Sequence, residues 1–182
     1  MSKYEEYIRD IIQFIGDDPN GEHCKDTPKR VVKSWKELYG GYLKSPQEAL
    51  GTVFSSDGYD QMVILKDIEM YSTCSHHMIP FVGKVHIAYI PGKKVVGLSK
   101  LARLVEVFAR RLQVQERLTQ QIADSLHKVL KPKGVMVVIE SKHFCMCSRG
   151  ISKQNSIMTT SAVIGRFKTD NATRQEFLNL IK

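Results

Sequence analysis

Two short stretches of the chain concentrate the side chains best suited to bind a metal ion. The first, residues 74–77, reads Cys-Ser-His-His, and the second carries His143, Cys145 and Cys147. A Cys-x-x-His spacing lets a thiolate and an imidazole reach one ion when the backbone turns between them. A third ligand from a distant segment would leave the fourth tetrahedral position open for water, which is typical of catalytic zinc sites. The alternative is that these are ordinary buried cysteines and hydrogen-bonded histidines.

The spacing leaves the individual roles open. On a strand, residues two apart share a face, so we expect His143, Cys145 and Cys147 to point into one pocket, with either cysteine as the ligand. His76 and His77 must point in different directions. One of them can bind the metal while the other transfers protons, because histidine titrates near neutral pH.

Composition narrows the class of protein. The chain has 182 residues, 42% hydrophobic and 25% charged, which is ordinary for a globular domain. It carries no apolar run long enough for a membrane span and no signal peptide, so we expect a cytoplasmic protein with reduced thiols and no membrane partner. The net charge of +8 reflects either solubility or an anionic ligand. Since the basic residues form no single run, a phosphorylated small molecule is favoured over nucleic acid.

A candidate phosphate site lies in the run Ser99-Lys100-x-x-Arg103. Ser99 is a good N-cap, and backbone N–H groups at a helix start attract phosphate. Lys100 and Arg103 are three apart and therefore share a helix face. The alternative is a capped, solvated helix start.

Hydrophobic periodicity predicts an α+β protein with a mainly antiparallel sheet. Helices are expected over residues 4–15, 27–39, from 45, 99–112, about 115–129 and 173–181, and strands over 62–66, 68–71, 82–90, 95–96, 135–140 and 156–167. The second helix should begin with Thr27 as its N-cap and bury its apolar face through Leu38. In the third strand Val85, Ile87 and Tyr89 should face one way and His86 the other. We expect a helical segment over residues 1–60 and a catalytic domain over 61–182.

Four motifs, in this order, resemble the GTP cyclohydrolase I family. They are Cys-Ser-His-His-x-x-Pro-Phe-x-Gly-Lys-Val-His from Cys74, Gly-Leu-Ser-Lys-Leu-Ala-Arg from Gly97, Arg-Arg-Leu-Gln-Val-Gln-Glu-Arg-Leu-Thr from Arg110, and His-x-Cys-Met-x-x-Arg-Gly from His143. The similarity is continuous from about residue 67 to 167, with residues 26–31 echoing it upstream. It implies the tunnelling fold, an antiparallel sheet with two long helices on one side, here after an N-terminal helical segment. It also implies a homodecamer with sites at subunit interfaces.

The resemblance implies an enzyme that converts GTP and water to 7,8-dihydroneopterin triphosphate and formate, the first step of pterin and folate synthesis. It acts on the C–N bonds of a cyclic amidine with one zinc ion per subunit. By motif, zinc falls on Cys74, His77 and Cys145, and the acid–base histidines are His76 and His143. Glu116, with Gln115 beside it, matches the reader of the guanine edge. The ribose and triphosphate positions correspond to Ser99, Lys100, Arg103 and Arg149, and Arg30 matches a further phosphate contact.

Two departures from the family pattern stand out. Ser75 replaces the usual glutamate between cysteine and histidine, and Cys147 is an extra thiol that is either an alternate ligand or an oxidation liability. Three other classes of protein are alternatives. A zinc deaminase needs His-x-Glu and Pro-Cys-x-x-Cys, both absent here. The queuosine-pathway nitrile reductase of the same fold works without zinc. The third is a basic binding module with a structural metal.

Overall fold

The computed structural model describes residues 1–182, which group into two compact units, 1–40 and 41–182. The first unit consists of helices α1 (Lys3–Ile15) and α2 (Thr27–Leu38). A reciprocal capping box between Ser2 and Glu5 starts α1, and Gly16, in a left-handed conformation with φ of 105°, ends it. Ile8 and Ile12 are the buried residues of α1, which packs on α2.

Helix α2 departs from the sequence-based expectation in two ways. Its N-cap is Asp26, so that Thr27 is the first helical residue. Leu38, which was expected to be buried, is 39% exposed. A unit of two helices has only one interface, and residues on the far side of α2 find nothing in that unit to pack against.

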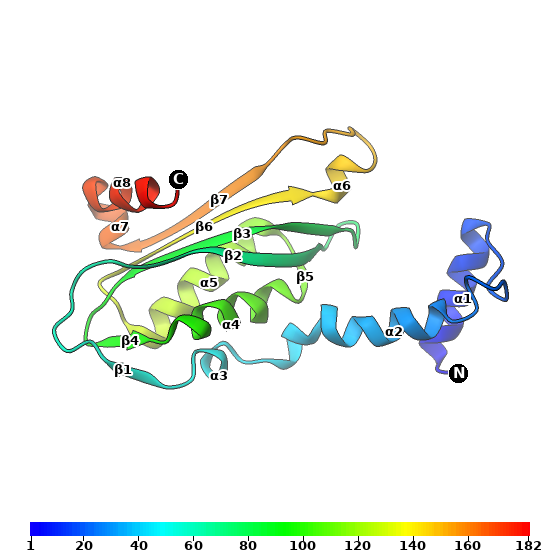
Figure 1. The fold of residues 1–182 in the computed structure, drawn as a ribbon, viewed down its shortest axis with the longest axis horizontal. Coiled ribbons are helices and arrows are strands. Elements are labelled where there is room, and N and C mark those ends of the chain that lie inside the picture. Colours follow the sequence, from blue (N-terminus) through cyan, green and yellow to red (C-terminus); the bar gives the residue numbers. More distant parts are fainter. The chain divides into compact units, whose positions relative to one another are not determined.

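The second unit contains the sheet and the remaining helices (Figure 1). Its large sheet has the order β5-β2-β3-β6-β7, antiparallel throughout except for the parallel pair β2 and β5. A separate two-stranded sheet pairs β1 with β4. The elements, beginning at the boundary between the units, are η1 (Gly40–Leu43), α3 (Pro46–Leu50), β1 (Val53–Ser55), β2 (Val63–Cys74), β3 (Pro80–Ile90), β4 (Lys94–Val96), α4 (Leu98–Ala109), β5 (Leu112–Gln113), α5 (Gln115–Leu130), β6 (Gly134–His143), α6 (Phe144–Cys147), β7 (Met158–Gly165), α7 (Arg166–Thr169) and α8 (Asn171–Leu180).

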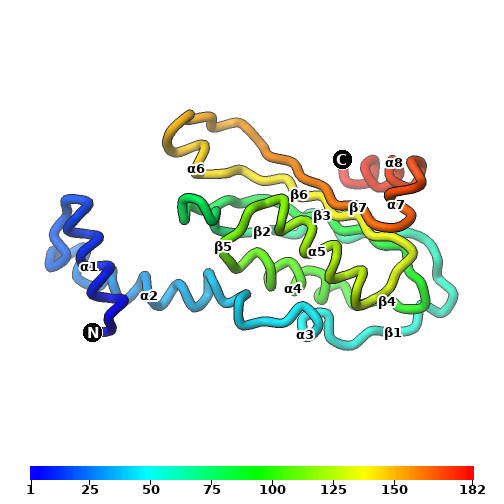
Figure 2. The backbone as a smooth tube through the Cα atoms, turned by 180° about the vertical axis from the view of Figure 1, so that it is seen from behind, coloured from blue at the N-terminus to red at the C-terminus, as the bar shows by residue number.

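The two long helices α4 and α5 cover one face of the large sheet, and α7 and α8 lie toward the other (Figures 1 and 2). The main core lies between the sheet and α4 and α5, and includes Val85, Ile87 and Tyr89 from β3. A smaller core on the outer face is formed by Ala88, Ile90, Met136, Val138, Phe167 and Phe177. The predicted alternation along β3 is therefore confirmed, as is the α+β class with a mainly antiparallel sheet.

One row of side chains on β6 changes character along its length. Val135, Val137 and Ile139 face α4 and α5 in the main core. Because alternate residues of a strand share a face, Ser141 and His143 continue this row where the core ends. Polar groups therefore follow apolar ones on the same side of the sheet, at the end where β6 meets α6.

The segment between the N-terminal helices and the large sheet packs with the second unit: α3 contacts α4, and β1 pairs with β4. The division at residue 60 stays a prediction from the sequence. No helix has both the length and the apolar composition needed to cross a membrane.

Candidate active site

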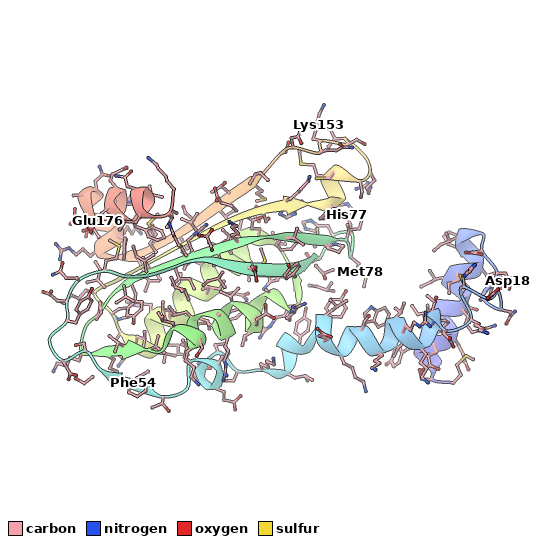
Figure 3. All side chains as sticks on the ribbon, viewed as in Figure 1. Asp18, Phe54, His77, Met78, Lys153 and Glu176 are labelled. Atoms are coloured by element: carbon pink, nitrogen blue, oxygen red, sulfur yellow. The ribbon has the colours of Figure 1, made fainter.

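The β2–β3 hairpin turn holds the first ligand cluster in place. Cys74 is the last residue of β2, and its N–H donates to the Ile79 carbonyl at 2.9 Å. The Met78 N–H in turn donates to the Cys74 carbonyl at 2.8 Å. The tight turn puts Met78 in the left-handed region, with φ of 54°. Ser75 N–H donates to the Gln113 carbonyl on β5 at 2.9 Å. His77 and Met78 thus occupy the tip of an anchored hairpin (Figure 3).

Cys74, His77 and Cys145 bring one ligand atom each to within 4.8 Å of the others. Cys74 Sγ lies 3.8 Å from His77 Nδ1. Two ligands of one tetrahedral zinc, at about 2.3 Å for sulfur and 2.0 Å for nitrogen, would be roughly 3.5 Å apart. The donor set and its spacing therefore fit a metal ion that prefers mixed sulfur and nitrogen ligands.

The second cluster does not continue as a strand, and the expectation that His143, Cys145 and Cys147 share one face is wrong. Strand β6 ends at His143, and residues 144–147 form the short helix α6. In a helix, residues two apart point in different directions, so the two thiols separate. Cys145 joins the group with Cys74 and His77, while Cys147 is 8% exposed with Sγ 4.0 Å from the Gln154 carbonyl.

The electrostatics of the cysteine pair favour a cation. Burial raises the pKa of the Cys145 thiol, and the neighbouring Cys74 raises it further. Two thiolates side by side are unfavourable without a positive charge, and a metal ion reverses this by binding the deprotonated form. Ser75 is not one of the three candidate ligands.

His143 is held by a stack and a hydrogen bond. Its ring lies parallel to Phe81, with centroids 4.5 Å apart and planes 4° apart. Nε2 lies 2.8 Å from Gln115 Oε1. Burial lowers the pKa of the His143 imidazole, and the nearby Glu116 carboxylate opposes that shift.

Gln115, the first residue of α5, is 1% exposed and every polar atom of its amide is occupied. Its Oε1 also accepts from Ser141 Oγ at 2.6 Å. Its Nε2 lies 3.1 Å from each of three acceptors, which are the carbonyls of Ile139 and Met158 and the hydroxyl of Thr160. Gln115 therefore ties α5 to β6 and β7 beside His143.

Three more predicted site residues lie at this end of the sheet. His76 is exposed on the hairpin, edge-on to His77 with ring centroids 6.2 Å apart. Glu116, next to the buried Gln115, is exposed, and Arg149 donates to the Cys145 carbonyl at 3.4 Å. A cavity of about 390 Å³ borders the second cluster and is lined by His143, Cys145, Met146, Ser156, Ile157 and Met158.

The remaining predicted residues lie elsewhere. Ser99, Lys100 and Arg103 belong to the first turns of α4, and the N-cap of that helix is Gly97 rather than Ser99. Helix α4 has 12 residues and is about 18 Å long, and its other end leads to β5, which pairs with Cys74. The α4 start therefore lies a helix length from the cysteines. Arg30 is on α2 of the N-terminal unit, paired with Asp26 at 3.4 Å.

Comparison with known proteins identifies the family. A family model described as GTP cyclohydrolase I matches residues 4–182. The chain belongs to the GTP cyclohydrolase I family. The motif resemblance, the tunnelling fold it implied and the assignment to this class of hydrolase are thereby confirmed.

Two relatives of the same name agree with the family match. A protein of Wolinella succinogenes named GTP cyclohydrolase 1 is 63% identical over 178 residues, covering 98% of this chain and 95% of the relative. One of the same name from Chlorobium chlorochromatii is 55% identical, covering 98% of this chain and 80% of the relative. A solved structure of apo archaeosine synthase QueF-Like is 18% identical, with a TM-score of 0.46, covering 57% of this chain and 93% of that one.

Sequence reasoning missed the residues that support His143. Phe81 stacks on its ring, and Ser141 and Thr160 bond to the Gln115 amide. One signal was present, since Ser141 and His143 are alternate polar residues at the end of an apolar row on β6. The contact to α5 spans 28 residues of sequence and could not be read from local spacing.

Proposed function

We propose that this chain catalyses the hydrolysis and rearrangement of GTP to 7,8-dihydroneopterin triphosphate with release of formate. The observation that carries the proposal is the Cys74–His77–Cys145 group, with His143 and Glu116 beside it, in a chain of this family. Opening the imidazole ring of guanine requires an activated water and a group that moves protons at the ring nitrogen.

Zinc is the metal we propose, held by Cys74, His77 and Cys145, one ion per chain. Bound zinc lowers the pKa of a water molecule to near neutrality and so provides a nucleophile. The protein groups next to it are His143, which is firmly held, and His76, which is exposed on a turn. We propose that both move protons, His143 from a fixed position and His76 from a more adjustable one.

Glu116 is our candidate for guanine recognition. A carboxylate accepts two hydrogen bonds from N1–H and the 2-amino group of guanine, and adenine offers no such pair. Sites built to pair polar groups reject an analogue lacking them by roughly 10⁴-fold or more. Glu116 is exposed and close enough to His143 to influence its pKa, which supports this role.

We propose that triphosphate binding uses a second copy of the chain. Arg149 lies at the metal end, but Ser99, Lys100 and Arg103 lie a helix length away, so we propose that a neighbouring subunit supplies their contacts. Arg30 is a further proposed phosphate contact. The sheet supports assembly, because β7 pairs only with β6, and β2 pairs with β5 only at Thr73 and Cys74. Such free edges favour strand pairing between copies, consistent with the homodecamer expected for the family.

The test is to incubate metal-replete protein with GTP or ATP and to measure formate and the fluorescent pterin formed after oxidation. We expect product from GTP alone, and loss of product on chelation of the metal. A matched pair of variants probes guanine reading: Glu116→Gln should lose activity, whereas Gln120→Glu on the next turn should not. Absence of formate from GTP at one bound zinc per chain would refute the proposed function.

A further inference from the structure

We propose that Gln115 is a positioning residue, in place of the substrate contact that the family resemblance suggested. Its side-chain oxygen accepts the Nε2–H of His143 and so selects the ring tautomer in which Nδ1, with its lone pair, is the nitrogen available to substrate. This rests on the proposed function for its catalytic meaning, but the tautomer itself follows from the hydrogen bonds alone.

The orientation of the Gln115 amide has only one consistent assignment. One end lies 3.1 Å from the carbonyl oxygens of Ile139 and Met158, and carbonyls only accept hydrogen bonds. That end must be the NH₂ group, since an oxygen there would face two other oxygens. The opposite end, which faces Ser141 and His143, is therefore the acceptor Oε1.

The surrounding hydroxyls agree with this assignment. Thr119 Oγ1 donates to the Gln115 backbone carbonyl at 2.7 Å, so the 2.7 Å contact between Thr119 and Thr160 must use the Thr160 proton. Thr160 Oγ1 is then free to accept from Gln115 Nε2. Each donor in the chain of bonds has an acceptor, and reversing the amide would break it.

The orientation of the Gln115 amide determines the tautomer of His143. An oxygen that can only accept lies 2.8 Å from its Nε2, so Nε2 must carry hydrogen. The ring also lies flat against Phe81, which helps to hold its plane in this orientation. In the neutral ring Nδ1 has no hydrogen, and it is the atom left to accept a hydrogen bond from substrate or water.

Gln115 and Glu116 are adjacent on α5 but differ in burial, which indicates different roles. Gln115 is 1% exposed and its amide is fully engaged within the protein, whereas Glu116 is exposed. A substrate could reach the Gln115 side chain only by breaking bonds to β6 and β7. Gln115 therefore acts through His143 rather than by touching the base.

The kinetic test compares Gln115→Met with Thr119→Val. The first removes the acceptor at similar volume and should lower kcat roughly 10- to 100-fold, with KM for GTP and bound zinc nearly unchanged. The second removes a hydroxyl from the same network without touching His143, and should change kcat by less than about 3-fold. Equal losses in both variants would mean a general packing effect and would overturn the proposal.

A double-mutant cycle asks whether Gln115 acts through His143. In a His143→Ala background, Gln115→Met should have almost no further effect on kcat, because residues that act as a unit are not additive. Persistence of the full loss in that background would contradict the inference. Thermal unfolding of each variant confirms that the compared proteins are folded.

Neutron diffraction on deuterium-exchanged crystals of the unaltered protein tests the tautomer without any variant. We expect deuterium on His143 Nε2, pointing at Gln115. Deuterium on Nδ1 alone would overturn the proposal even if the enzyme is active. If the protein shows the expected tautomer but releases no formate from GTP, the proposed function fails while the assigned hydrogen-bond geometry stands.

Discussion

Two histidines on neighbouring strands, the half-buried His143 on β6 and the buried His86 on β3, show how the two faces of one sheet treat the same side chain. Burial lowers the pKa of both. At His143, Nε2 is bound to Gln115. At His86 the pattern is reversed, since Nδ1 accepts the Asp67 N–H at 3.2 Å and Nε2 has no hydrogen-bond partner.

The two histidines differ in hydrogen bonding because their surroundings differ. His143 borders a cavity and lies two residues from a candidate metal ligand, so its unbound nitrogen is available for chemistry. His86 faces the outer side, where it secures the backbone of Asp67 at the irregularity in β2 between Leu65 and Ile68. Burial alone therefore does not mark a catalytic histidine; the identity of the bound nitrogen and the surroundings of the free one do.

The largest expected effect comes from removing a proposed metal ligand near His143. Cys145→Ala should abolish formate release and lower bound zinc far below one per chain, because a three-ligand site becomes a two-ligand site. Elemental analysis after dialysis measures the metal. Cys147→Ala and His86→Gln are the controls and should retain zinc, so loss of zinc in Cys147→Ala would move the ligand assignment to that thiol.

Replacing each of the two histidines separately should show which one the activity depends on. His143→Ala is expected to lower kcat roughly 10²- to 10⁴-fold, the usual contribution of a general acid or base, while the protein remains folded. His86→Gln should leave kcat close to that of the unaltered enzyme. Comparable loss of kcat in both variants would show that the contrast between the two faces is not functional.

A substitution at Gly83 tests the pairing of β3 with β6, the strands that carry the two histidines. It pairs with Ser141, and a Cβ there would overlap the carbonyl oxygen of Glu140 on β6. Backbone cannot yield as a flexible side chain does, so Gly83→Ala should cost about 3 kcal/mol or more in unfolding free energy. Chemical denaturation measures this change in unfolding free energy. Gly40→Ala, at a position with open space around it and no positive φ, is a comparison for the loss of glycine itself.

The smallest effect concerns acid stability at His86. Its pKa in the folded protein is lowered by burial from the ordinary 6.5, with Asp67 and Glu140 opposing the shift and Lys84 adding to it. The unfolded chain therefore takes up a proton first as the pH falls below about 6.5, and the free energy of unfolding decreases until the folded ring also titrates. Replacing His86 with glutamine should flatten that slope. An identical slope in both proteins would exclude His86 as its source.

Sequence patterns predicted those features that depend on local periodicity or on motifs. The alternation along β3, the amphipathic α1 and the antiparallel sheet follow from spacing, and the motifs point to Cys74, His77 and Cys145, which the structure brings together. The family match supports this interpretation over the rival classes.

What the sequence did not predict depends on contacts between distant segments or on competing local preferences. Residues 144–147 could extend β6, yet they form a helical turn after His143. The N-cap of α4 moved from Ser99 to Gly97, whose extended conformation lets the helix start two residues earlier. The hydrogen bonds of Gln115 could not be predicted because its partners Ser141 and Thr160 lie 26 and 45 residues away.

The length of α4 has a consequence for mixed populations of chains. If one subunit contributes the cysteine end and its neighbour the Ser99–Arg103 end, a defect at either end can be masked by the other copy. Chains carrying His143→Ala and chains carrying Arg103→Ala should each be nearly inactive alone. Co-assembled in equal amounts they should regain activity at roughly a quarter of the sites, half times half for random mixing. Two inactive variants of this protein should thus complement each other when they assemble together.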